Sequence, residues 1–502
     1  MAEIGNGTNP YGDDDAYDED GEPVAGTPRP VTAGVPVPHG PEDDGVAQVE
    51  SELYARIGEQ APERRLAATR RAVELLGDPQ HAFPVIHITG TNGKTSTARM
   101  IESIVRAHGL RTGLMTSPHL VSIRERIVID GEPIRPESFV ENWRDIQPYL
   151  TMTDDELRAA GQQPLTFFEA LTVLAIACFA DAPVDVAVIE VGMGGEWDST
   201  NVVDGQVAVF TPIAIDHAKQ LGNTVAEIAR TKAGIIKPSA AVVSARQTPE
   251  ALGELERAAA LSEATLAVEA TSGPNGGFRV LSDTPAVGGQ LVSVQGVAGR
   301  YDDLFVPLFG AHQAENAAVA IAAVESFLGR GSQPLDEDVL SEGLAAATSP
   351  GRLQPIAQQP TVVVDAAHNP HGARALAEAL PVAFPSDHVV GVLGVLADKD
   401  ARGIVRALKD VVATFVVTQP PGPRALDADA FAAIVVDEVG PDRVVVEPDV
   451  EAALAEARTL AEDADAEADL AEGEPGAMVL VAGSIVLIGR VMDLVHGEGE
   501  SA

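Results

Sequence analysis

The spacing of apolar and polar residues divides the chain into a tail, two helices and two series of strand-like runs. Residues 1 to about 46 are rich in Asp, Glu, Gly and Pro and lack apolar periodicity, so they bury too little surface to offset the entropy of ordering. We predict a disordered acidic tail over 1–46. Apolar residues then recur at helical spacing in "VESELYARI" and "RRLAATRRAVELLGDP". Two helices are therefore expected ahead of the first strand.

Short apolar runs follow, with helical segments between them. The first series is "PVIHIT", "VDVAVIEV", "VAVFTPI" and "AAVVSA". After a Ser-Pro-Gly break near residue 350, a second series begins, with "TVVVDAAH", "HVVGVLGVL", "ATFVVTQ", "RVVVEP" and "AMVLVAGS". Continuous apolar strands that alternate with helices indicate parallel sheets covered on both faces. We therefore predict two α/β domains, over residues 47–350 and 351–502.

Composition restricts the partners and the setting. The chain has 34 basic and 75 acidic residues and a net charge of −41, which would repel nucleic acids and anionic membranes. The one cysteine, Cys178, lies in an apolar run and excludes an intramolecular disulfide, so a buried thiol is expected. No run reaches the ~18 apolar residues of a membrane span, and we predict a cytoplasmic protein with no membrane partner. The acidic run over 461–476 is interpreted as a solvated helix face and loop.

The segment "FPVIHITGTNGKTSTARM" has the order strand, glycine loop, helix that a phosphate-binding loop requires. Gly90 and Gly93 would let backbone N–H groups converge on phosphate oxygens, and Lys94 would supply positive charge. Thr95 would offer its hydroxyl to Mg²⁺ at the start of the helix. Ile88 stands where a strict P-loop has its first glycine, so the cradle is a shorter one. A Gly-Lys-Thr sequence in an ordinary turn is the alternative.

Two further clusters follow apolar strands. Glu190 ends the strand of "VIEVGMGGEWDSTN", where a carboxylate suits a cation or water ligand, although a solvent-facing strand end would look the same. Asp216 and His217 follow the strand of "TPIAIDHAKQ", where a lone histidine is more often a core or surface residue than a ligand. These positions place Lys94, Glu190 and His217 at one edge of the sheet, where open α/β proteins bind ligands.

The motifs together resemble the ATP-dependent Mur ligase superfamily and, within it, folylpolyglutamate synthase, which in many bacteria is also a dihydrofolate synthase. The resemblance covers roughly residues 50 to 490. It rests on "GTNGKTS", "TSPHL", "FFEALT", "EVGMGGEWDSTN", "IDHAKQLGNTVAEIARTKAGIIKP", "GAHQAENAAVA", "GRLQ", "DAAHNP" and "AGSIVLIG", in family order. The shorter glycine loop is normal in that family. The implied fold is α/β, a P-loop-type, mostly parallel sheet ATPase domain followed by a smaller Rossmann-like domain.

The resemblance also implies site residues. The ATP-binding positions would be Gly90, Thr91, Asn92, Gly93, Lys94, Thr95, Ser96, Gln313, Asn316, Arg352, Asp365 and His368. Two Mg²⁺ ions are implied, and their ligands would be Thr95, Ser117, Glu190 and His217. The folate-binding positions would be Phe168, Asp198 and Ser199, and the catalytic ones Lys94, Lys232 and His217. Lys232 matches a lysine that the family carbamylates to make a metal ligand.

Some of these positions have plainer interpretations, and some depart from the family. Lys232 could be an ordinary helix lysine, Arg352 a surface arginine and Phe168 a core residue. The chain has Ser199 where alanine is common and Trp197 where leucine is usual. The shape of the folate pocket is therefore open.

The implied reaction makes an amide from a carboxylate. ATP would phosphorylate the carboxylate of a reduced folate or of dihydropteroate, and the amine of L-glutamate would attack the acyl phosphate. Because water would destroy that intermediate, the C-terminal domain is expected to close over the site, in a monomeric enzyme.

Three other functions remain to be weighed. A UDP-muramyl amino-acid ligase of the same superfamily would normally carry a separate N-terminal UDP-binding domain. A nucleotide-regulated binding module, such as a GTPase-like switch, usually has an Asn-Lys-x-Asp run, which "ADKDA" at 397–401 does not match. A purely structural acidic protein would not need a glycine cradle.

Overall fold

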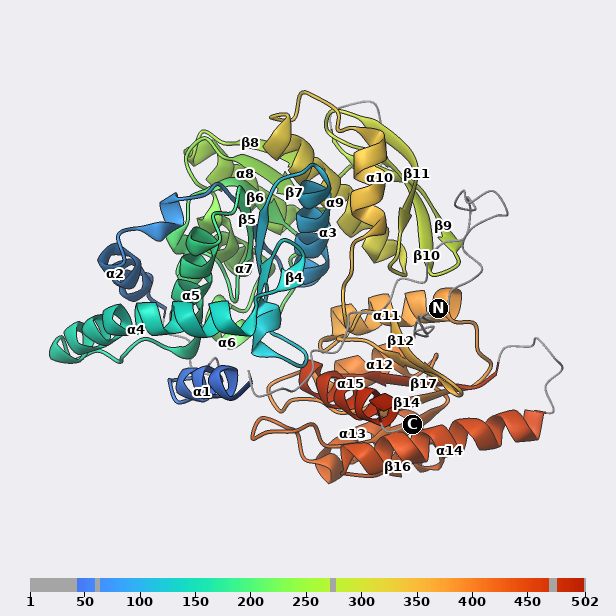
Figure 1. Cartoon of the computed structure of the whole chain (residues 1–502). Coiled ribbons are helices and arrows are strands. Elements are labelled where there is room, and N and C mark those ends of the chain that lie inside the picture. The colour runs from blue at the N-terminus through green and yellow to red at the C-terminus, as the bar shows by residue number, and fades with distance from the viewer. Residues whose placement is uncertain (1–42, 59–63, 271–276, 469–475, 501–502) are drawn as a thin grey trace, which may run out of the picture. The chain divides into compact units, whose positions relative to one another are not determined.

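The computed structural model describes residues 43–58, 64–270, 277–468 and 476–500; Figure 1 shows their course. The first two helices, α1 (Asp43–Tyr54) and α2 (Ala67–Leu75), occur where helical spacing predicts them. Residues 43–46 belong to α1 and not to the tail, because Val46 is buried together with Val49 and Leu53 on the apolar face of this helix. The rest of the predicted tail lies outside the described residues.

An eight-stranded sheet organises the first α/β domain. Its strands are β1 (Val85–Thr89), β2 (Thr112–Met115), β3 (Ile127–Ile129), β4 (Glu132–Pro133), β5 (Val186–Glu190), β6 (Gly205–Phe210), β7 (Ala241–Ser244) and β8 (Thr265–Val268). The spatial order is β4-β3-β2-β5-β1-β6-β7-β8. In this spatial order, all neighbouring strands from β2 through β5, β1, β6 and β7 to β8 pair in parallel. The β3 strand pairs antiparallel with both β2 and β4. The prediction of a mostly parallel sheet is confirmed.

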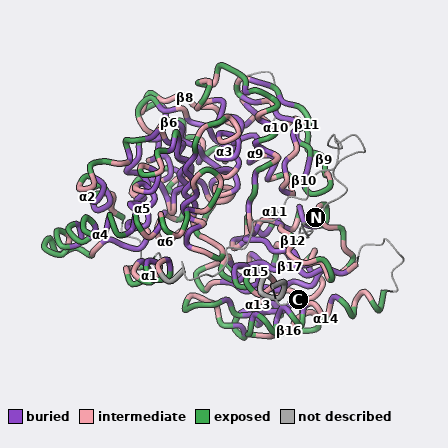
Figure 2. The backbone as a smooth tube through the Cα atoms, in the orientation of Figure 1, coloured by how far each residue is buried: buried purple, intermediate pink, exposed green. Residues whose placement is uncertain are grey.

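Helices cover this sheet on both faces. They are α3 (Lys94–Ala107), α4 (Pro136–Ala159), α5 (Phe167–Asp181), α6 (Ala218–Leu221), α7 (Val225–Lys232), α8 (Pro249–Leu261), α9 (Ala311–Leu328) and α10 (Glu337–Ala345). Four 3-10 turns join them, namely η1 (Pro79–His81), η2 (Ile123–Arg126), η3 (Ser199–Val202) and η4 (Ala233–Ile235). Alternate residues of β5 enter different cores, with Val188 beside α3 and α9, and Ile189 beside α4 and α5. The central strands are therefore buried on both faces, as the colours of Figure 2 show.

A small antiparallel sheet was not expected from the sequence. It consists of β9 (Arg279–Ala286), β10 (Gly289–Gln295) and β11 (Arg300–Val306), with β10 in the middle. The strand β9 is largely exposed and polar, so it lacks the continuous apolar run by which the parallel strands are recognised.

The second α/β domain contains a six-stranded sheet in the order β12-β13-β17-β14-β15-β16. The strands are β12 (Gln354–Gln358), β13 (Thr361–Val364), β14 (Val389–Leu393), β15 (Thr414–Val417), β16 (Val444–Val446) and β17 (Met478–Ala482). The helices are α11 (Pro370–Ala383), α12 (Ala401–Leu408), α13 (Ala428–Val439), α14 (Val450–Ala468) and α15 (Ile485–Glu500), with the turn η5 (Pro441–Arg443). All pairs are parallel except β12 with β13. The five strand-like runs of the second series all form strands.

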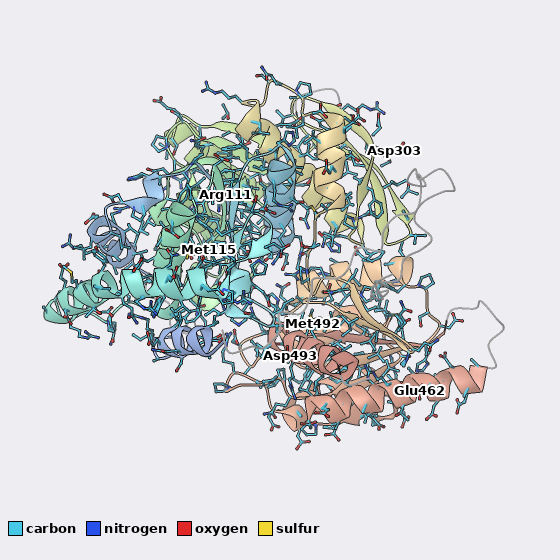
Figure 3. The ribbon with its side chains drawn as sticks, viewed as in Figure 1. Arg111, Met115, Asp303, Glu462, Met492 and Asp493 are labelled. Atoms are coloured by element: carbon cyan, nitrogen blue, oxygen red, sulfur yellow. The ribbon has the colours of Figure 1, made fainter. Side chains whose placement is uncertain are left out.

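Three smaller expectations can also be checked. The acidic run begins on α14, where Glu462 is exposed and points outward in Figure 3, and residues 469–475 lie outside the described part. The thiol of Cys178 is buried and free, as predicted. Among the described residues, we find no helix with the length and apolar character needed to cross a membrane.

Candidate active site

The glycine loop joins β1 to α3 at the carboxyl edge of the large sheet. Gly90 has φ +156° and Gly93 has φ +86°, and both are closely packed. A Cβ on Gly90 would lie 1.8 Å from Thr211 Oγ1, and one on Gly93 would lie 2.6 Å from Asn316 Oδ1. No side chain caps the N-terminus of α3. Its first N–H groups are therefore available to an anion such as a phosphate.

Glu190 reaches the start of α3 from the end of β5. Its carboxylate accepts hydrogen bonds from Thr95 Oγ1 at 3.0 Å and from Ser117 N at 3.4 Å. The side chain is 1% exposed, so the solvent-facing alternative is wrong. Burial raises the pKa of Glu190, whereas Lys94 and the hydroxyl of Thr95 act to lower it. A buried carboxylate beside a hydroxyl at a helix N-terminus is a suitable oxygen donor set for Mg²⁺.

His217 lies beside Asp216, in the segment after β6. It follows β6 with φ +50°, and its Nε2 is 3.9 Å from Asp216 Oδ2. Asp216 also contacts Lys399 Nζ at 3.0 Å and His368 Nε2 at 3.9 Å. Burial lowers the pKa of His217 to about 4. For Asp216, burial acts to raise the pKa, but the charges of His217, Lys399 and His368 hold it below its usual range.

The assignment of Thr95, Ser117, Glu190 and His217 as metal ligands stays a prediction. Within the described ranges, no group of three or more His, Cys, Asp and Glu side chains could hold a metal ion. The structure brings Thr95 and Ser117 to Glu190, and it places His217 beside Asp216.

Lys232 is the last residue of α7, and its side chain turns into the protein. It is 4% exposed, and Nζ donates a 2.7 Å hydrogen bond to the carbonyl oxygen of Gly90. Burial, and secondarily the charge of Lys94, lowers the pKa of Lys232 from 10.5 to about 7. A large share of this amine is therefore neutral and nucleophilic near neutral pH, unlike an ordinary helix lysine.

Three of the residues predicted to bind ATP support the glycine loop from behind. Asn316 Nδ2 donates to Gln313 Oε1 at 3.0 Å, and Gln313 Nε2 lies 3.5 Å from Ser96 Oγ. Ser96 Oγ also lies 3.0 Å from Ser349 Oγ, just ahead of Arg352. All of these side chains except Arg352 are buried. In this geometry they join the start of α3 to α9 and to Ser349, and Asn316 packs against Gly93 of the loop.

The second domain contacts the glycine loop directly. Asn369 Nδ2 donates to Asn92 Oδ1 at 3.0 Å.

The predicted ATP-binding residue Asp365 forms its hydrogen bonds within the second domain. At the end of β13, it accepts from Leu353 N at 2.9 Å and from Ala367 N at 2.8 Å. Burial raises the pKa of Asp365, and the nearby charge of Arg352 opposes this. Asn369 and Lys399 were not among the predicted site residues, although Asn369 stands in "DAAHNP" and Lys399 in "ADKD", after β14.

The predicted folate residues lie together around the loop after β5. Ser199 Oγ is 2.8 Å from Thr172 Oγ1, one helical turn beyond Phe168 on α5. The ring of Phe168 packs on Gly192, where a Cβ would lie only 2.4 Å from Cε1 of the ring. Asp198 is 4% exposed and accepts hydrogen bonds from main-chain and side-chain groups of this loop. The predicted trio thus shares one wall, formed by α5 and the loop.

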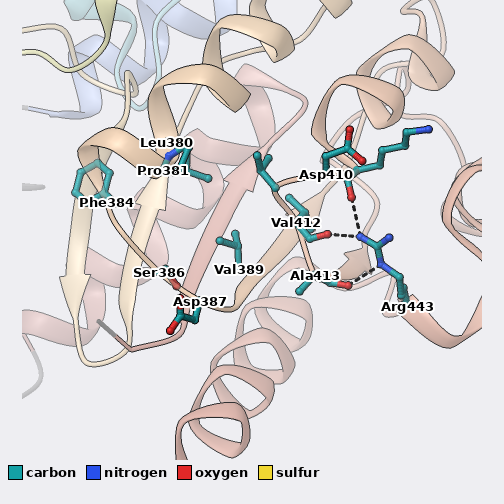
Figure 4. A pocket seen from close by; sticks show the side chains of 12 residues that line it. Leu380, Pro381, Phe384, Ser386, Asp387, Val389, Asp410, Val412, Ala413 and Arg443 are labelled. Atoms are coloured by element: carbon teal, nitrogen blue, oxygen red, sulfur yellow. Dashed lines mark hydrogen bonds between the residues drawn. The ribbon is translucent and has the colours of Figure 1, made fainter. Parts of the chain in front are cut away.

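A hollow in the second domain is lined by cationic as well as acidic side chains. It has a volume of about 500 Å³ and lies near the amino ends of β14 and β15, as Figure 4 shows. The guanidinium of Arg443 donates to the carbonyl oxygens of Lys409, Val412 and Ala413. This cation is therefore occupied by main chain, and Asp410 adds negative charge.

A glycine loop between a parallel strand and a helix, with a lysine, a hydroxyl and a buried carboxylate around it, defines a nucleotide-binding α/β protein with a second α/β domain beside the loop. Residues 88–324 match the Mur ligase middle domain, and residues 351–485 match the glutamate ligase domain of the Mur ligases. The chain belongs to the Mur ligase family, in its dihydrofolate synthase/folylpolyglutamate synthase branch. The resemblance inferred from the motifs is confirmed.

Relatives and solved structures agree over nearly the whole chain. The dihydrofolate synthase/folylpolyglutamate synthase of Mycobacterium tuberculosis is 44% identical over 94% of this chain and 98% of its own. The folylpolyglutamate synthase of Lacticaseibacillus casei is 36% identical over 78% of this chain and 88% of its own. The M. tuberculosis folylpolyglutamate synthase complexed with ADP superposes with a TM-score of 0.85 at 44% identity, covering 90% of this chain and 99% of that one. Escherichia coli FolC in complex with DHPP and ADP gives a TM-score of 0.74 at 28% identity, over 90% and 98% of the two chains.

Proposed function

We propose that this chain is an ATP-dependent ligase that adds L-glutamate to reduced folates, and also to dihydropteroate, through an acyl-phosphate intermediate. The observation that carries the proposal is the placement of Lys94, Thr95 and the buried Glu190 together at the glycine loop. Relatives that match most of this chain are named for these two activities. The same relatives favour this function over a UDP-muramyl ligase. A binding module without chemistry would not need the buried Glu190 and Lys232 at the loop.

The residues of the loop have separate tasks in this reaction. Backbone N–H groups at the start of α3 hold the phosphates, and Lys94 stabilises the charge that spreads over the transferred phosphoryl group. Mg²⁺, held by Thr95 and Glu190, would add Lewis-acid stabilisation of the phosphate oxygens. Asn369, in contact with Asn92 of the loop, keeps the second domain against the loop, which limits the access of water to the acyl phosphate.

We also propose that Lys232 is carbamylated. The neutral amine attacks the carbon of CO₂, a C–N bond forms as one C=O π bond opens and its electron pair moves to oxygen, and an amine proton passes to water, which leaves a carbamate anion. The burial of Lys232, the pKa of about 7 and the nearby Lys94 support this step, because a carbamate removes the repulsion between two cations. The resulting anion would join Glu190 as an oxygen donor for metal.

We further propose the extent of the two domains, the oligomeric state and the compartment. The domains would span 47–350 and 351–502, and the enzyme would be a monomer in the cytoplasm, where ATP and reduced folates are available. Gel filtration at micromolar concentration tests the monomer, because a dimer would elute at twice the mass.

The deciding experiment measures ADP release by the purified full chain. ATP, Mg²⁺ and L-glutamate are supplied with dihydropteroate in one assay and with tetrahydrofolate in the other, and the product is identified by mass. We expect glutamate-dependent release with both acceptors. Product from one acceptor alone would reduce the proposal to one activity, and product from neither would overturn it. Lys94→Met provides the matched control, with a folded protein and no turnover expected.

A further inference from the structure

Three hydrogen-bonded side chains connect the core of the large sheet to the loop of the predicted folate residues. His87, at the centre of β1, is fully buried, and its Nε2 lies 3.0 Å from Thr200 Oγ1. Thr200 Oγ1 donates in turn to Asp198 Oδ1 at 2.5 Å. A buried polar chain of this kind constrains geometry, because each group has few other partners.

The chemistry of the three groups fixes the direction of the chain. Both carboxylate oxygens of Asp198 accept main-chain N–H groups, and Oδ1 also accepts the hydroxyl proton of Thr200, so the hydroxyl oxygen accepts from His87. His87 is then a neutral imidazole with its proton on Nε2. Burial lowers the pKa of His87 to about 3, which keeps it neutral at physiological pH. Nδ1 of His87 carries only a lone pair in this tautomer, which agrees with its having no hydrogen-bond partner in the described part of the chain.

Asp198 uses its carboxylate to hold the loop after β5. Oδ2 accepts from Met193 N at 2.9 Å, and Oδ1 accepts from Thr200 N at 3.0 Å in addition to the hydroxyl. Met193 directly follows Gly192, on which the ring of Phe168 packs. The orientation of the carboxylate therefore determines where the main chain opposite Phe168 lies.

We propose that His87 and Thr200 are positioning residues for the pterin-bearing acceptor, which act through Asp198 on the wall formed by Gly192, Met193 and Phe168. The inference rests on the proposed function, since it requires that this wall receives the acceptor. It concerns binding of the acceptor and not phosphoryl transfer, because the hydrogen bonds of this network join His87, Thr200, Asp198 and Met193 and do not include Lys94 or Thr95. Loss of the hydroxyl of Thr200 removes a partner from His87 and from Asp198 together.

The test uses a matched pair at position 200 in the full-length enzyme. Thr200→Val removes the hydroxyl and keeps the branched shape, whereas Thr200→Ser keeps the hydroxyl. Steady-state kinetics give KM for tetrahydrofolate, KM for ATP and kcat, and thermal unfolding gives Tm. We expect Thr200→Val to raise KM for tetrahydrofolate about tenfold, the usual consequence of losing a hydrogen bond to a charged group, with KM for ATP and kcat unchanged. Thr200→Ser should retain the wild-type KM.

The alternatives give different results. An unchanged KM for tetrahydrofolate in Thr200→Val overturns the inference, and so does an equal rise of both KM values with a lower Tm, which indicates a merely structural network. If Thr200→Val does not fold, the pair His87→Gln and His87→Met replaces it, because glutamine can still present an N–H near the position of Nε2. If neither Thr200→Val nor His87→Met folds, the network has a structural role and the inference is overturned. A wild-type enzyme without turnover on any pterin acceptor overturns the proposed function and this inference together, whereas an active wild type with an unaffected variant overturns this inference alone.

Discussion

Replacing Lys232 with methionine should stabilise the folded protein while abolishing ligase activity. The side chain is 4% exposed, and burial lowers its pKa from 10.5 to about 7. Since each pKa unit corresponds to about 1.4 kcal/mol, keeping this amine in the fold costs roughly 4 to 5 kcal/mol below pH 7. Methionine, like lysine, has an unbranched side chain of similar length, but it carries no charge. The substitution therefore removes most of this cost.

One hydrogen bond acts in the opposite direction. Lys232 Nζ donates to Gly90 O at 2.7 Å, and removing the donor leaves a buried carbonyl without it, at a cost of about 1 to 3 kcal/mol. The net stabilisation expected for Lys232→Met is therefore roughly 1 to 4 kcal/mol, which corresponds to an increase in Tm of about a few degrees.

The pH dependence of this effect has a definite sign. The pKa of Lys232 is lower in the folded state than in the unfolded state, so between about pH 7 and 10.5 the unfolded state binds the additional proton. The stability of the wild type therefore rises with pH across this window, and that of the variant lacks this contribution. The advantage of the variant is complete below pH 7 and disappears as the pH approaches 10.5.

Thermal unfolding from pH 6 to pH 10 in CO₂-free buffer measures this difference without the carbamate. Lys219→Met, at an exposed lysine of α6, is the matched control and should leave Tm unchanged. A variant less stable than the wild type at every pH would refute the reasoning, as would a difference that is the same at pH 6 and pH 10. Retained turnover in Lys232→Met would exclude Lys232 from the chemistry.

Two further substitutions test the loop and the buried histidine. Gly93→Ala and Gly109→Ala both place alanine at positive φ, at a cost of about 1 kcal/mol, but a Cβ meets Asn316 only at position 93 and nothing within 4 Å at position 109. Only Gly93→Ala should raise KM for ATP, by about tenfold or more, and equal kinetics for the two variants would show that the contact with Asn316 is unimportant. His87→Gln should lose stability less steeply on acidification, by about 1.4 kcal/mol per pH unit between pH 6.5 and 3, because the unfolded wild type takes up a proton that buried His87 refuses. Urea unfolding at pH 7, 6 and 5 measures this slope, and parallel profiles for the two proteins would contradict it.

The parallel strands could be predicted from the sequence because burial on both faces requires continuous apolar runs. β1 and β5 are buried at every position, and both were expected. The antiparallel β9 was not expected, because a strand with an exposed polar face resembles a loop in composition. Helix α1 extends further into the acidic sequence than its charges suggest, because packing of Val46 outweighs local composition.

The candidate site could be predicted from the sequence only in part. A glycine loop is a local motif, so Lys94 and Thr95 could be located directly. The contact of Thr95 with Glu190 joins residues 95 positions apart, and only the pairing of β1 with β5 brings them together. The contacts of Asp216 with His368 and Lys399 likewise depend on the fold. No spacing in the sequence indicates them.

The position of β1 at the centre of the large sheet determines how the glycine loop responds to heat. β1 pairs with β5 on one side and β6 on the other, and its side chains enter both cores. Its amide hydrogens therefore belong to the class that exchanges with solvent only when the whole cooperative unit opens. Because the glycine loop starts directly after this strand, its shape persists until that opening. Loss of activity on heating and global unfolding should consequently be a single event in this protein.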